Sequence, residues 1–97
     1  MPNDQDPSSE SIAFDEAIRR MERQPPYGSH VQDVADRALR LLDALQRAGL
    51  AHEDISDYFK ARVGLVENPE AREHVAGCCA RAMTIRYGMG KRSTVNG

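Results

Sequence analysis

The chain has 97 residues, a formal net charge of −2 at pH 7, 40% hydrophobic residues and 29% charged residues. This length fits one domain with a modest core, and the composition is that of a globular chain rather than a disordered one. The small net charge disfavours both a dedicated nucleic-acid binder, which would carry a basic surplus, and a strongly acidic DNA mimic.

The sequence carries no sign of a membrane or secreted protein. No stretch approaches the ~20 apolar residues of a membrane span. The acidic, polar start lacks the basic and apolar regions of a secretory signal. The two cysteines are adjacent in the sequence. This arrangement does not indicate a disulfide framework and is typical of a protein in a reducing compartment. We therefore expect a cytoplasmic protein with no membrane partner.

The N-terminal part combines an arm with a first helix. Residues 1–10 are rich in proline, serine and acidic groups, and we expect a disordered acidic arm there. A helix is predicted over about residues 11–23, because apolar residues recur at spacings of three and four: Phe14, Ala17, Ile18 and Met21. Asp15→Arg19 and Glu16→Arg20 are acid-first pairs four residues apart, which support an exposed helical face. Pro25 and Pro26 end this helix.

A second helix is predicted over residues 29–48. Ser29 and Gln32 have the spacing of a capping box. The apolar stripe consists of Val31, Val34, Ala35, Ala38, Leu41, Leu42 and Leu45. Leu39 lies off this stripe and widens the buried face. On the side of the helix away from this stripe, three acidic residues each precede an arginine by four positions: Asp33→Arg37, Asp36→Arg40 and Asp43→Arg47. Gly49 and Leu50 then match a Schellman ending, in which Leu50 packs back on Leu45.

Two further helices complete the chain. Residues 52–63 form a short one, with Ile55, Tyr58, Phe59 and Val63 on one side. The last helix begins at Asn68 and Pro69, a cap followed by proline in the first turn. Its apolar side comprises Val75, Cys78, Cys79, Ala82, Met83 and Ile85. Gly88 and Gly90 end it, and residues 89–97 form a flexible basic tail. With no alternating strand pattern, we predict an all-α helical domain over residues 11–88, a small single-domain bundle or orthogonal array of about four helices.

No motif for catalysis, a metal or a cofactor emerges. His74 and Cys78 are four residues apart and share a helical face, but a structural zinc needs four ligands and the other histidines lie on different elements. A cysteine nucleophile would also need a paired base and an oxyanion site. We interpret Cys78 and Cys79 as small core residues and expect no metal, no cofactor and no enzymatic activity.

Residues 41–59 resemble a helix-turn-helix, with Gly49 in the turn. The resemblance implies a DNA-binding transcriptional regulator, in which the third helix enters the major groove. Two features depart from the motif: the bulky Leu45 stands where a small residue is wanted, and the recognition helix would open with three acidic residues, Glu53, Asp54 and Asp57. Negative charge there would face phosphates, so we favour an ordinary corner between two packed helices.

The remaining candidates for partner binding are basic and aromatic. Arg81, Arg86, Lys91 and Arg92 make the C-terminal part basic. Arg81 and Arg86 also fit a purely structural role, as cations that stabilise the C-terminal end of a helix. Lys91 and Arg92 lie beyond the last glycine and have no such structural role. Tyr58 sits beside charged residues, a setting favoured both at interfaces and at the edge of a core.

We therefore predict a small non-enzymatic protein-binding module, with the DNA-binding regulator as the alternative. In size and character the chain is similar to the small proteins that phages and mobile elements use to block a host complex, anti-CRISPR proteins among them. That similarity implies an inhibitor that occludes a partner surface. Glu53, Asp54 and Asp57 would then meet Lys and Arg on the partner. The identity of the partner and the oligomeric state stay open.

Overall fold

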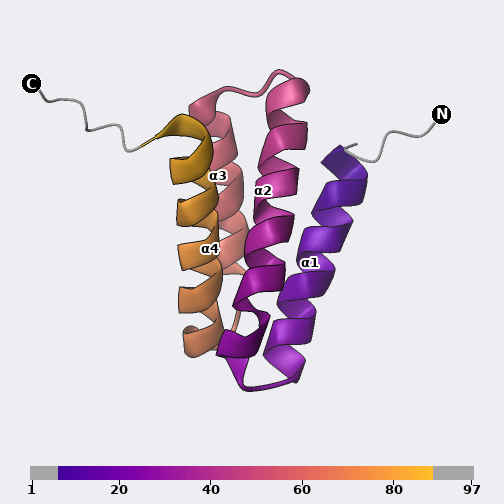
Figure 1. Cartoon of the computed structure of the whole chain (residues 1–97), viewed down its shortest axis with the longest axis vertical. Coiled ribbons are helices and arrows are strands. Elements are labelled where there is room, and N and C mark those ends of the chain that lie inside the picture. Colours follow the sequence, from indigo (N-terminus) through magenta and orange to yellow (C-terminus); the bar gives the residue numbers. More distant parts are fainter. Residues whose placement is uncertain (1–6, 89–97) are drawn as a thin grey trace, which may run out of the picture.

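The computed structural model describes residues 7–88, so residues 1–6 of the arm predicted for residues 1–10 and the tail over residues 89–97 lie outside the described part (Figure 1). Within that part the chain forms four α-helices and no strand, which confirms the all-α prediction. The elements are α1 (Pro7–Arg23), the 3₁₀ turn η1 (Tyr27–His30), α2 (Val31–Arg47), α3 (His52–Gly64) and α4 (Pro69–Tyr87). None of these helices has the length and hydropathy that a bilayer crossing requires.

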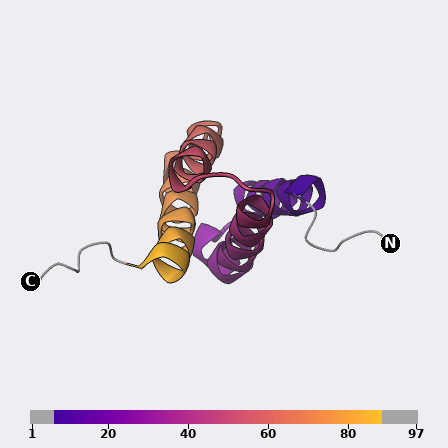
Figure 2. The ribbon, with the colours of Figure 1, turned by 90° about the horizontal axis from the view of Figure 1, so that it is seen from above.

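The helices form a bundle of two hairpins. In Figure 1, α1 descends and α2 ascends, then α3 descends and α4 ascends. Seen from above in Figure 2, the α1–α2 pair lies beside the α3–α4 pair. The two pairs meet mainly through α2 and α4, which run in the same direction. The order around the bundle is therefore α1–α2–α4–α3, and the outer side of the α2–α4 contact faces solvent.

One hydrophobic core lies between the helices. The predicted stripe of α2 supplies its centre, with Val34, Ala38, Leu41 and Leu42 fully buried. Phe14 of α1 packs edge-to-face on Phe59 of α3, with ring centroids 5.8 Å apart. The other helices contribute Ala17, Ile18, Met21, Ile55, Ala71, Val75, Cys78, Cys79 and Ala82, and the connection between α3 and α4 contributes Val66. Burial of these side chains is the main force that holds the hairpins together.

Two helix boundaries form as the sequence predicts. At the end of α2, Gly49 has φ +96° and its N–H donates to the Gln46 carbonyl, while the Leu50 N–H donates to the Leu45 carbonyl. These two bonds are the Schellman motif. At the start of α4, the Asn68 side chain accepts a hydrogen bond of 3.0 Å from the Ala71 N–H.

Three local predictions are wrong. α1 begins at Pro7, so residues 7–10 of the predicted arm are helical and Glu10 is buried; proline is well suited to a first helical turn because no partner is needed for its nitrogen there. The capping box at Ser29 does not form, because Ser29 belongs to η1 and its hydroxyl donates to the Pro26 carbonyl. Ile85, expected on the apolar side of α4, is 50% exposed.

Candidate functional site

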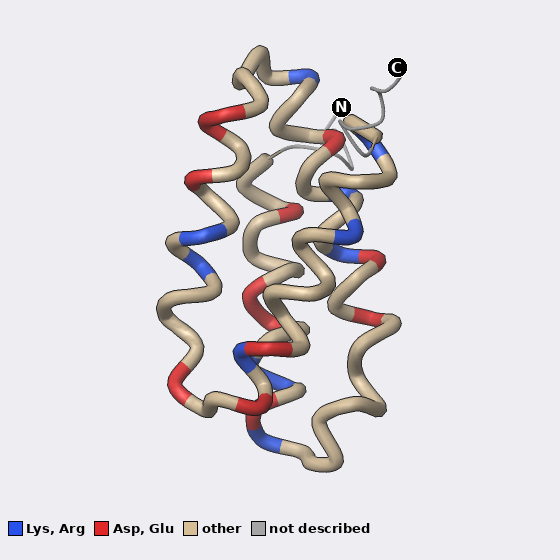
Figure 3. The backbone as a smooth tube through the Cα atoms, turned by 90° about the vertical axis from the view of Figure 1, so that its left-hand side faces the viewer, with Lys and Arg blue, Asp and Glu red and all other residues tan. Residues whose placement is uncertain are grey.

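The three predicted acidic residues form an open negative surface at the start of α3. Glu53, Asp54 and Asp57 are all exposed, and none of them has an ion pair within residues 7–88. Figure 3 shows acidic residues at the upper end of the bundle, where α3 begins. Glu53 and Asp54 lie in the first turn, where the helix dipole favours negative charge. We call Glu53, Asp54 and Asp57 the acidic surface.

Tyr58, which the sequence predicts to contact a partner, connects α3 to α1. Its hydroxyl lies 2.5 Å from the Ser11 hydroxyl oxygen, and the half-buried ring lies 5.4 Å from the Arg62 guanidinium carbon. Arg62 donates to Asp15 at 2.7 Å and to Ser11 at 3.1 Å. Partial burial opposes the charge on Arg62, but hydrogen bonds and charge interactions with Tyr58 and Asp15 outweigh it and raise the pKa of Arg62. Tyr58 therefore takes part in a network that links α1 and α3, and its contact with a partner stays a prediction.

The predicted basic residues separate into different roles. Arg86 makes a two-pronged ion pair with Asp43 of α2, and its Nη2 lies 2.9 Å from Oδ2. The hydrogen bond from Arg86 lowers the pKa of Asp43, against the opposing effect of partial burial. Arg86 therefore joins α4 to α2. Arg81 is exposed and has no ion pair within residues 7–88. Lys91 and Arg92 lie outside the described residues.

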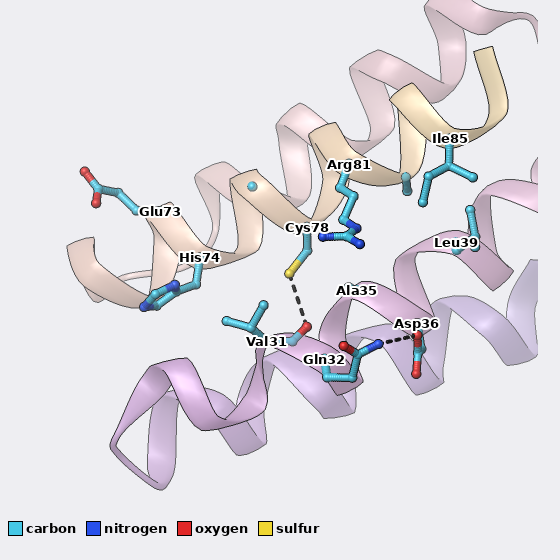
Figure 4. A pocket seen from close by; sticks show the side chains of 12 residues that line it. Val31, Gln32, Ala35, Asp36, Leu39, Glu73, His74, Cys78, Arg81 and Ile85 are labelled. Carbon is cyan, nitrogen blue, oxygen red and sulfur yellow. Dashed lines mark hydrogen bonds between the residues drawn. The ribbon is translucent and has the colours of Figure 1, made fainter. Parts of the chain in front are cut away.

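A groove between α2 and α4 is a surface that the sequence did not predict. It has a volume of about 350 Å³ (Figure 4). On α2 its apolar residues are Val31, Ala35 and Leu39, and on α4 they include Ala82 and Ile85. Polar residues surround this apolar part: Gln32, Asp36, Glu73, His74 and Arg81. The one sequence signal for this groove was Leu39, an apolar residue that lies off the main apolar stripe of α2.

Cys78 and His74 line this groove, whereas Cys79 lines a second pocket between α3 and α4. The Cys78 Sγ lies 3.5 Å from the Val31 carbonyl oxygen, to which it donates (Figure 4). Burial raises the pKa of Cys78 to about 11, and Arg81 only partly opposes this effect. Burial and the neighbouring Cys78 raise the pKa of Cys79 to about 12. Both are therefore thiols at neutral pH, and thiols are poor nucleophiles and poor metal ligands. Residues 7–88 hold no group of three or more side chains placed to bind a metal.

The corner over residues 41–59 joins two antiparallel helices that lie diagonally across the bundle. α2 and α3 run in opposite directions along the bundle (Figure 1), whereas the two helices of a helix-turn-helix meet at roughly 90–120°. Leu45 is buried in the core, where the motif wants a small residue. On the outside, the first residues of α3 present the acidic surface. This arrangement does not favour insertion of α3 into a DNA groove.

Comparisons with known proteins add no relationship to this geometry. No protein family, no curated protein and no solved structure matches the chain.

Proposed function

We propose that the chain is a small non-enzymatic protein-binding module that covers a basic surface of another protein. The acidic surface of α3 is the proposed contact. The mode of action is inhibition by occlusion, as in the small phage and mobile-element proteins that this chain is similar to in size and character.

The charge arrangement of the acidic surface is the observation that carries the proposal. Three other acidic side chains are held by basic ones from other helices, namely Asp15 by Arg62, Asp43 by Arg86 and Asp33 by Arg20. The remaining exposed acidic residues without an ion pair are not grouped as closely as those of the acidic surface. The acidic surface instead places three carboxylates within five positions, with no Lys or Arg between them. Like charges on one helical face repel each other, and a partner that supplies Lys or Arg would relieve this repulsion.

This arrangement also suits rapid recognition. Exposed charges contribute little to the stability of the free protein, but they steer oppositely charged partners into contact. A groove or cleft that binds nucleic acid is a typical basic target, because it must attract phosphates. A bound acidic helix end would compete there with the nucleic acid.

The test is affinity capture from the native cytosol, run with and without nuclease, using the wild-type chain and two triple variants. The first variant reverses the acidic surface: Glu53→Lys, Asp54→Lys and Asp57→Lys. The matched control reverses three exposed acidic residues on other parts of the bundle: Glu16→Lys, Glu67→Lys and Glu70→Lys.

We expect the wild type and the control to retain one stoichiometric protein that the acidic-surface variant loses. Binding should also weaken as salt is added, because salt screens exposed charges. Equal capture by all three chains would contradict the role of the acidic surface. Recovery of DNA that disappears with nuclease, and that the acidic-surface variant binds as well or better, would instead favour the DNA-binding regulator.

A further inference from the structure

The outer face of α4 carries small and apolar residues among its charged ones. Ala76, Gly77, Ala80 and Ile85 are exposed there. The groove between α2 and α4 runs along this face (Figure 4).

Glu73, Gly77 and Arg81, spaced four residues apart, form one exposed row on this face. All three also line the groove. Rows of this spacing are the ridges through which helices pack most often, at crossing angles of about 50°. The row is therefore a possible contact ridge for another helix.

Gly77 stands at the centre of the row, and the fold itself does not require glycine there. Apart from proline, glycine is the least favourable residue inside a helix. A Cβ built at Gly77 meets nothing within 4 Å, so no packing within the chain excludes a larger residue. A bare backbone does, however, allow a second helix to approach closely.

The row carries opposite charges on the two sides of Gly77. It is therefore complementary in charge to the same row of a second copy that runs in the opposite direction. Glu73 and Arg81 lie four residues on either side of Gly77, and both are exposed. Neither has an ion pair within residues 7–88. If two copies cross in opposite directions at Gly77, Glu73 of each copy meets Arg81 of the other. The contact thus pairs opposite charges twice.

We infer that two copies of the chain associate as a symmetric antiparallel dimer through this row of α4, beside the α2–α4 groove. A twofold contact brings the same patch of both subunits together in opposite directions, so that patch must be complementary to itself. The charges on the two sides of Gly77 meet this requirement. The inference is independent of the acidic surface on α3.

The test is the molar mass in solution of the full chain, measured by sedimentation equilibrium with reducing agent present. The wild type is expected to dimerise as its concentration rises. Glu73→Arg and Arg81→Glu, each alone, place like charges at both ends of the contact and should raise the dissociation constant at least about tenfold. An equimolar mixture of the two variants restores both opposite-charge pairs and should form a heterodimer.

Two further variants complete the design. Gly77→Gln should also abolish the dimer, because a side chain there separates the two helices. Arg23→Glu changes an exposed arginine of α1 by the same charge and should leave the dimer intact. A wild type that stays monomeric up to about 1 mM would overturn the inference. A dimer that survives Glu73→Arg and Arg81→Glu, or a mixture that fails to associate, would overturn it as well.

Discussion

Replacing Leu41 by alanine should remove a large part of the stability of this domain. The Leu41 side chain is fully buried at the centre of the core, where α2 contacts the other helices. Truncation to alanine loses the transfer free energy of the removed carbons and leaves a cavity, which together amount to about 2–5 kcal/mol. A small domain has only about 5–15 kcal/mol of total stability. For this chain length, a loss of about 3 kcal/mol corresponds to a fall in Tm of roughly 12–24 °C.

Leu39→Ala is the matched control, because it makes the same chemical change two positions away on the same helix. Leu39 is only partly buried and borders the open α2–α4 groove, so its removal leaves no closed cavity. We expect a loss of about 1 kcal/mol or less. Urea unfolding followed by circular dichroism, at one fixed protein concentration, measures both variants. Equal losses for Leu39→Ala and Leu41→Ala would refute the assignment of the core to the stripe that contains Leu41.

Three further predictions concern single sites. Gly77→Ala should stabilise the monomer by up to about 1 kcal/mol in thermal unfolding at low concentration, because the new methyl group meets open space within a helix. The ion pair with Arg86 lowers the pKa of Asp43 below its ordinary value of 3.8, so its contribution is present above that value and is lost as pH falls through the lower folded pKa. The advantage of the wild type over Asp43→Asn should therefore be about 1 kcal/mol or less at neutral pH and should vanish in acid unfolding at about pH 2. Cys78 and Cys79, with pKa values of about 11 and 12, should react slowly with a thiol reagent in the native protein and rapidly in denaturant; equal rates would contradict their burial.

The sequence alone was sufficient to predict the helices and most of their core positions. Their apolar spacing, the Schellman residues Gly49 and Leu50, and the cap at Asn68 act between residues a few positions apart. Such interactions are present in the sequence as a pattern. The errors at Pro7 and Ser29 are also local, and arise where two local structures competed for the same residues.

Of the charge pairs predicted within one helix, Asp33 and Arg37 do form an ion pair, at 3.7 Å. The charged contacts between helices could not be predicted in this way. Spacing suggested that Asp15 would pair with Arg19 and Asp43 with Arg47, because these are neighbours along one helix. In the structure Asp15 binds Arg62 of α3, and Asp43 binds Arg86 of α4. The partners are more than forty residues apart in the sequence, so only the packing of the hairpins brings them together. The same packing places Tyr58 against α1.

The tertiary structure also decided which surfaces remain available. The sequence marked the acidic residues of α3 correctly as an exposed group, because charge that close to a helix start is stable in water. It did not reveal the α2–α4 groove or the exposed row through Gly77, since both depend on which helices are neighbours. Periodicity shows that a helix has a face to bury, but the order α1–α2–α4–α3 determines what covers that face and what stays open.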